Sequence, residues 1–257
     1  MIRPSAALLL LCLAAAACAS TSGSSDHSYG ADAKSNYETG MKNLEGKDYL
    51  EAQRYLEFVS AKFPYSTFSA LADLALGDLY FQQEKFVEAI DKYRNFIKLH
   101  PTHPRDDYAA LQVANSYYEQ IPSDLFFLPS SAEKDQTDVK AALTSYGEFL
   151  AQYPSSELRP KGLTRVGELR HRLADHELRI GQYYLRHDRA ASAAGRFETV
   201  LRDFPGAGFD GAAALLLHEA YGKLGQPEKG RDALQRLVKE HPDDPRVGEA
   251  KRLLGAG

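Results

Sequence analysis

The segment "HELRIGQYYLRHDRAASAAGRFETVLRDFPG", residues 176–206, carries the spacing pattern that indicates the fold class. Its Gly181 is followed twelve residues later by Ala193, and a proline follows twelve residues after that. Phe197 and Val200 stand four and seven residues beyond Ala193, and these offsets fall on one face of an α-helix. A small residue on that face lets a second helix approach closely. The stretch therefore predicts a helix, a short turn and a second helix that ends near a proline.

The same spacing recurs along the chain. An aromatic residue or a histidine precedes a proline five times, and the five prolines are 37, 53, 51 and 37 residues apart. Those prolines are Pro64, Pro101, Pro154, Pro205 and Pro242. The small residues twelve positions before them are Ala52, Ala89, Ala142, Ala193 and Gly230. Glycine, alanine, aromatic residue and proline at fixed spacing form the tetratricopeptide pattern.

The repeats predict an all-α fold, an α-solenoid of five tetratricopeptide-like helix pairs with a C-terminal capping helix. A stack of repeats needs such a cap to cover its last apolar face. Residues 34–257 form this repeat domain. The expected units are about 34–64, 67–101, 105–154, 156–205 and 209–242, with the cap at 244–254.

Two units are longer than the others. The third has about 16 extra residues around "QIPSDLFFLPSSAEKDQTD", residues 120–138, whose Phe126 and Phe127 either pack back against the helices or form a partner site. The fourth has about 14 extra residues and lacks a helix breaker between Gly162 and Tyr184. We expect one long helix there that projects from the stack.

The N-terminus has the layout of a secretory signal peptide at residues 1–17. Arg3 precedes an uninterrupted apolar run of fourteen residues, whereas a membrane-spanning helix needs about 20. Three alanines then lead into Cys18, which resembles the bacterial lipobox and predicts a lipid on that cysteine. Two alternatives are lipidation of Cys12 and an ordinary cleaved signal. Residues 18–33, rich in Ser, Gly and Asp, are expected to form a flexible tether.

The remaining composition argues against chemistry. If Cys18 carries the lipid, the mature chain has no free thiol, which excludes disulfides and cysteine catalysis. A formal charge of -4, or -5 without Arg3, offers no basic field for nucleic acid. His100 and His103 each adjoin a proline, so turn roles are favoured over a metal site. No metalloprotease, phosphate-loop or nucleophile-elbow motif is found, so we expect no cofactor and no enzyme activity.

Stacked helical repeats offer a concave surface to peptides or partner proteins, so the chain is interpreted as a binding and assembly protein. The first helix of each unit usually lines that surface. Aromatic side chains there either grip an extended peptide or pack between helices. The candidate groove residues are Tyr37, Met41, Asp78, Phe81, Asn115 and Tyr118.

Several strings resemble the BamD family, the lipoproteins of the bacterial outer-membrane β-barrel assembly machinery. They are the opening stretch, "FPYSTFS" (63–69), "LHPTHPRDDYA" (99–109) and "SYGEFLAQYPSSE" (145–157), and the resemblance runs from about Asn36 to Gly225. It implies a lipid-anchored protein of the outer membrane that faces the periplasm. It also implies that the N-terminal repeats bind unfolded β-barrel clients and that the C-terminal repeats dock on a BamA-type barrel protein, beside other Bam lipoproteins.

The resemblance assigns one further residue. Arg196 of "GRFE" matches the family arginine linked to communication with BamA, although a plain surface arginine is the alternative. A different tetratricopeptide lipoprotein, such as a pilus-assembly or Tol–Pal accessory scaffold, is the rival function. An enzyme on a helical-toroid fold is disfavoured because no acid–base constellation is found.

Overall fold

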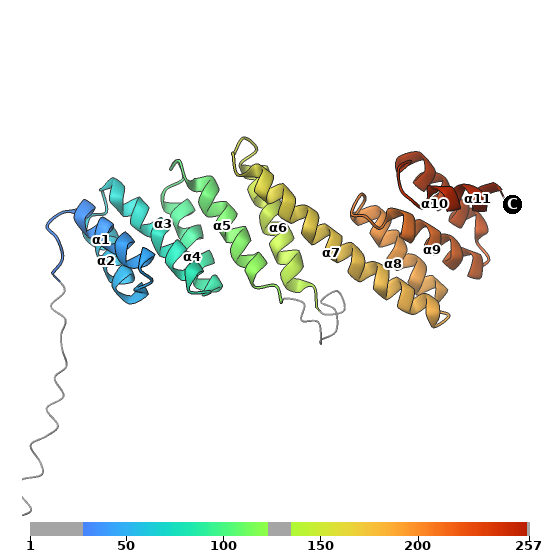
Figure 1. Cartoon of the computed structure of the whole chain (residues 1–257), viewed down its shortest axis with the longest axis horizontal. Helices are drawn as coiled ribbons and strands as arrows, with labels where there is room; N and C mark the ends of the chain where they lie inside the picture. The colour runs from blue at the N-terminus through green and yellow to red at the C-terminus, as the bar shows by residue number, and fades with distance from the viewer. Residues whose placement is uncertain (1–27, 123–134, 256–257) are drawn as a thin grey trace, which may run out of the picture.

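The computed structural model describes residues 28–122 and 135–255, and within them it holds eleven α-helices and no β-strand. Five pairs follow one another along an extended row, and a last helix closes it (Figure 1). The predicted all-α solenoid of helix pairs with a C-terminal cap is confirmed. The first helices of the pairs are α1 (Ala33–Glu45), α3 (Thr67–Gln82), α5 (Asp106–Glu119), α7 (Arg159–Arg186) and α9 (Asp210–Lys223). The second helices are α2 (Tyr49–Lys62), α4 (Phe86–Leu99), α6 (Thr137–Gln152), α8 (Ala190–Asp203) and α10 (Pro227–Glu240), and the cap is α11 (Val247–Gly255).

The core lies between consecutive helices and is built from the repeated residues. In each second helix the small residue and the apolar residues four and seven positions later are buried, so one face of each helix is apolar along its length. This burial is the main source of stability, since short helices are marginal by themselves. The residues are Ala52, Leu56, Val59, Ala89, Tyr93, Phe96, Ala142, Tyr146, Phe149, Ala193, Phe197, Val200, Gly230, Leu234 and Leu237.

The helix ends follow local chemistry. The Asp32 carboxylate caps α1 by accepting a hydrogen bond from the Ser35 backbone amide at 2.9 Å. Before α10 the chain passes through Gly225 at φ 69°, a left-handed conformation that glycine adopts without a steric penalty. Pro227 then occupies the first position of α10, where its missing amide hydrogen costs nothing.

Helix α7, 28 residues long, lies in the middle of the row, where it packs against α6 of the third unit and against α8 and α9 (Figure 1). Leu169 and Leu173 near its middle share a core with Phe149, and Leu178 further along shares another with Phe197. The single long helix is as expected, but the expectation that it projects from the stack is wrong. Its buried leucines, Leu169, Leu173 and Leu178, follow one another at spacings of four and five residues. One face of the helix therefore packs against α6 and then against α8.

The chain that enters α1 is held against the first pair. The Asn36 side chain, 1% exposed, donates to the Gly30 carbonyl at 2.9 Å and accepts from the Gly30 amide at 2.8 Å. The Tyr29 ring stacks on Phe58 with centroids 4.0 Å apart, and its edge meets Tyr55. We call the contacts of Tyr29 and Gly30 with Tyr55, Phe58 and Asn36 the N-terminal clasp.

Candidate partner-binding surfaces

Asp78 on α3 lies at the centre of a hydrogen-bonded cluster between the second and third pairs. Its Oδ1 accepts hydrogen bonds from the hydroxyls of Tyr93 at 2.7 Å and Tyr108 at 2.8 Å. Burial raises the pKa of the Asp78 carboxyl, and the two hydroxyl donors oppose that shift. The guanidinium of Arg105 lies 4.4 Å from the centre of the Tyr108 ring. The carboxylate is therefore bound by hydroxyls from α4 and α5, and the Arg105 cation is near enough to act on it electrostatically.

The same chain of hydrogen bonds reaches Asn115. Gln112 donates to the Tyr108 hydroxyl at 3.2 Å, and Asn115 donates to the Gln112 side-chain oxygen. The hydroxyl of Tyr146 on α6 then donates to Asn115 Oδ1 at 2.6 Å, and burial raises the Tyr146 pKa so that it stays a donor. Two of the predicted groove residues, Asp78 and Asn115, thus belong to one network that links α3, α4, α5 and α6.

Tyr118, further along α5, contacts α7. Its hydroxyl accepts from Arg165 at 3.1 Å and donates to Glu168 at 3.2 Å, and the two charged groups are 2.7 Å apart. The guanidinium of Arg165 also covers the Tyr118 ring, 4.2 Å from its centre. The aromatic face of Tyr118 is therefore already occupied by a side chain of the same protein.

The other three predicted groove residues are half-buried. The Tyr37 ring is tilted against Phe68 at 5.5 Å, and Met41 packs on the same core of the first pair. Phe81, at the end of α3, meets the edge of Phe86 at 5.5 Å. These side chains keep part of their surface exposed but are fixed by packing. Tyr37 and Met41 pack on the core of the first pair, whereas Phe81 packs on the core that contains Tyr93 and Tyr108.

Arg196 on α8 is bound within the protein. Its Nη1 donates to Glu177 Oε2 on α7 at 2.8 Å, and the two side chains are 41% and 14% exposed. The pair fixes the plane of the guanidinium, whose remaining donors are available on the exposed side. The geometry is compatible with both the surface-arginine interpretation and a contact to a partner carboxylate.

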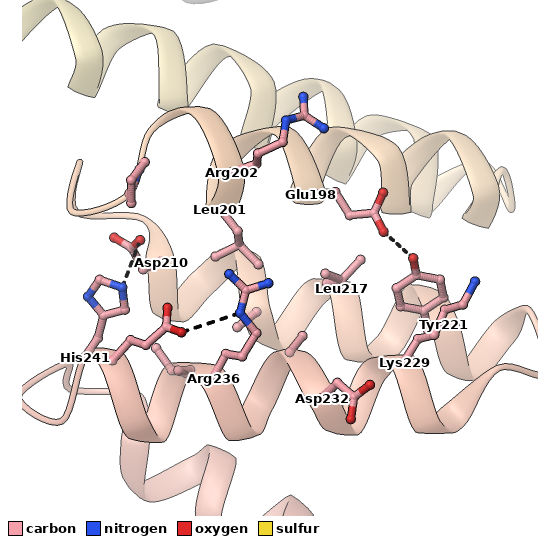
Figure 2. A pocket seen from close by; sticks show the side chains of 15 residues that line it. Glu198, Leu201, Arg202, Asp210, Leu217, Tyr221, Lys229, Asp232, Arg236 and His241 are labelled. Atoms are coloured by element: carbon pink, nitrogen blue, oxygen red, sulfur yellow. Dashed lines mark hydrogen bonds and ion pairs between the residues drawn. The ribbon is translucent and has the colours of Figure 1, made fainter.

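A trough that the sequence did not predict runs between α8 and α10 over α9, with a volume of about 730 Å³. The α9 stripe that forms its floor runs from Asp210 through Leu217 to Tyr221, about 16 Å at the rise of a helix. Figure 2 shows the Tyr221 hydroxyl bound to Glu198 at one end, and His241, whose Nε2 lies 3.4 Å from Asp210 Oδ1, at the other. The hydrogen bond to Glu198 raises the pKa of Tyr221 to about 12.

The trough exists because of small residues in its walls. Ala214 on α9 and Ala233 on α10 are buried, and both line it. Side chains of this size cannot fill the space between two helices, and the neighbouring Leu201 and Leu237 line the apolar part. Ala214 and Ala233 lie outside the repeat positions used in the sequence analysis, so their small size was not taken as a sign of a trough.

Over residues 28–122 and 135–255 the structure offers no grouping of three or more His, Cys, Asp or Glu side chains that could hold a metal ion. His100 instead pairs with Asp73 at 3.0 Å, and Asp73 accepts from Ser60 at 2.6 Å. The same stretch of chain contains no helix long and apolar enough to span a membrane. Cys18, Cys12, Phe126 and Phe127 lie outside the described residues, so the lipid site and the insertion stay predictions.

Comparison with known proteins places these features in one family. The profile of the family YfiO, described as an outer membrane lipoprotein, matches residues 30–237. The outer membrane protein assembly factor BamD of Caulobacter vibrioides is 28% identical over 218 residues, 85% of this chain and 69% of that protein. BamD of Neisseria meningitidis serogroup A is 24% identical over 211 residues (81% and 79%), and BamD of Haemophilus influenzae is 25% identical over 244 residues (94% and 92%). Because the profile spans most of the repeat stack, the chain belongs to the YfiO family of outer membrane lipoproteins, which is the BamD family.

Proposed function

We propose that this chain is an outer-membrane protein assembly factor, a non-enzymatic adaptor that joins unfolded β-barrel clients to a BamA-type barrel protein and its accessory Bam lipoproteins. The observation that carries the proposal is the family match over residues 30–237, which covers the stack almost from end to end. A lipid on Cys18 would hold the protein to the outer membrane on its periplasmic side. The comparisons do not favour the rival pilus-assembly or Tol–Pal scaffold.

The first three units are the proposed client side. Tyr37, Met41 and Phe81 keep partly exposed apolar surface on first helices, where an extended client segment would lie. Asp78, Asn115 and Tyr118 are engaged with neighbouring side chains, so their role there is to fix the shape of the surface and to offer polar edges. Aromatic contacts of this kind add to affinity without demanding one client sequence.

The last two units are the proposed docking side for the BamA-type protein. Arg196, oriented by Glu177, presents donors that match a carboxylate. The trough between α8 and α10 adds an apolar floor with charged ends. Division of labour between the ends suits a repeat stack, since each unit contacts mainly its neighbours.

The test measures two affinities in the intact mature protein. Tyr37→Ala combined with Phe81→Ala should weaken binding of peptides from barrel-protein C-termini and leave binding to the periplasmic domains of the BamA-type protein unchanged. Arg196→Glu should do the reverse. Circular dichroism and thermal unfolding establish that each variant is folded.

Glu177→Gln is the matched control for Arg196. It removes the internal ion pair but keeps the arginine, so a docking role predicts a much smaller loss than in Arg196→Glu. Equal losses in both variants would assign Arg196 a purely structural role. If the Tyr37→Ala, Phe81→Ala double variant and the Arg196→Glu variant lose binding to the same partner, the two-ended adaptor model is wrong. A general scaffold then describes the protein better.

A further inference from the structure

A second polar pocket, of about 370 Å³, lies where the turn between α4 and α5 meets the turn between α6 and α7. Asp106, the first residue of α5, lines it and is only 8% exposed. Its Oδ1 is buried and has no hydrogen-bond partner among the described residues, and the same holds for the hydroxyl of Tyr153, which also lines the pocket. Two residues that line this pocket thus each carry a buried polar atom without a hydrogen-bond partner among the described residues, a costly arrangement unless something bonds to these atoms.

The fifth unit shows how the aspartate equivalent to Asp106 obtains hydrogen-bond partners. Asp106 stands five residues after Pro101, and Asp210 stands five residues after Pro205. Both oxygens of Asp210 accept from the Gly206 amide at 3.1 Å, and His241 lies 3.4 Å away. His241 precedes the proline that ends its unit, as Tyr153 precedes Pro154. At equivalent places, the carboxylate of the fifth unit has hydrogen-bond partners, whereas Asp106 Oδ1 of the third unit has none among the described residues.

The negative charge of the pocket favours a cationic ligand. Asp106, Asp107 and Glu157 line it, and none of the described residues that line it is a lysine or an arginine. Arg105, the nearest cation in sequence, lies on the Tyr108 ring. Asp107 is already satisfied, since its carboxylate accepts from Ser156 at 2.6 Å and from the Tyr108 amide at 2.7 Å. Asp106 is thus the one buried carboxylate there with an open acceptor.

We propose that this pocket binds an alkylammonium or guanidinium head group, which donates hydrogen bonds to Asp106 Oδ1 and to the Tyr153 hydroxyl oxygen. A cation with N–H donors satisfies both orphan atoms and compensates the buried charge. His103 lines the pocket, and burial lowers its pKa, so it does not compete as a cation at neutral pH. The proposal is independent of the adaptor function.

The experiment uses the mature chain with isotopic labels on backbone nitrogens and tyrosine rings. Butylammonium and ethylguanidinium are titrated while NMR follows Asp106 and Tyr153. We expect saturable shifts at both residues. Asp106→Asn should weaken binding by about tenfold or more, the size expected for a hydrogen bond to a charged group. Tyr153→Phe should weaken it less.

Two controls separate this site from general attraction of cations. Tetramethylammonium has the charge but no N–H donor and should give no saturable shift. Asp210→Asn changes the equivalent, satisfied carboxylate and should leave both probes bound as in the parent. The absence of saturable shifts, equal binding of tetramethylammonium or Mg²⁺, or unchanged binding in Asp106→Asn would overturn the proposal, with a bridging water as the simplest occupant.

The source of the head group is then found with a photo-crosslinking residue at Ser155 on the pocket rim. A cross-link in membranes to a lysine- or arginine-bearing segment of another protein, lost in Asp106→Asn, supports a side chain of a partner. Binding of the small probes without such a cross-link supports a free amine.

Discussion

Gly181 on α7 lies directly against the ring of Phe197 on α8. A Cβ atom at position 181 would be 2.5 Å from Cε1 of that ring, closer than real Cβ contacts come. The same relation joins Gly77 to Tyr93 at 2.5 Å. The glycine and the aromatic residue of the repeat are therefore one packing unit, in which the missing side chain of the first makes room for the second.

Gly181→Ala should destabilise the protein by roughly 1–3 kcal/mol, because Phe197 is fully buried and its ring cannot move aside without strain. Gly195→Ala on the exposed side of α8 is the control, since a Cβ there meets nothing within 4 Å. It should stabilise by roughly 0.5–1 kcal/mol, the helix preference of alanine over glycine. Urea unfolding measures both, and equal effects of the two substitutions would contradict the packing argument.

The fifth unit reverses the pair. His218 replaces the glycine of the first helix and Gly230 replaces the alanine of the second, where a Cβ would lie 2.8 Å from the side-chain Nδ1 of His218 and 2.9 Å from its Cα. Gly230→Ala, although it restores the residue typical of the repeat, should therefore destabilise. Combined with His218→Gly it should cost less than the sum of the single changes. A double-mutant cycle by thermal unfolding tests this, and simple additivity would count against it.

Asp78 should make stability depend on pH. Its folded pKa is raised above the ordinary value of 3.8, so the folded state holds its proton more tightly than the unfolded state. The contribution of this group to stability is complete below pH 3.8 and is lost as pH rises through the folded pKa. Asp78→Asn removes the titration. The free energy of unfolding of the variant should rise relative to the parent across that window, and parallel pH profiles would show that Asp78 is not the cause.

Cys18→Ala should abolish lipidation and release the mature protein from membranes or leave it unprocessed. Cys12→Ala is the control and should leave membrane attachment unchanged. Mass spectrometry of the membrane-bound form measures the modification directly. An unmodified Cys18 within an intact N-terminus would refute the lipoprotein interpretation.

The helix pairs were predictable because their signals are local. Gly181, Ala193 and Phe197 lie within 17 residues of one another, and their offsets alone place them on facing helix surfaces. The course of α7 was not predictable in this way. Leu169 and Leu178 are buried by cores that other units complete, and the pattern of one helix does not say which partners stand beside it.

The hydrogen-bonded network around Asp78 and Asn115 was not predicted, for a related reason. Asp78 and Tyr108 are 30 residues apart, and their hydrogen bond forms only when α3 and α5 stack. The position of Asp78 and Asn115 on first helices made them candidates, but it did not show that both accept hydrogen bonds from tyrosine hydroxyls of the same protein. The trough depends on the small side chains of Ala214 and Ala233. Because alanine carries no functional group, nothing in the sequence predicted a pocket at these positions.

The N-terminal clasp has a consequence for how high the protein can stand above a membrane. With a lipid on Cys18, the start of α1 at Ala33 lies fifteen residues along the chain from the anchor, but Tyr29, where the clasp begins, lies only eleven residues along. A fully extended chain covers at most about 3.6 Å per residue, so the clasp lowers the maximum distance between the anchor and the first fixed residue from about 54 Å to about 40 Å. If Cys18 carries the lipid, stacking of Tyr29 on Phe58 would therefore shorten the tether and hold the first pair closer to the lipid surface.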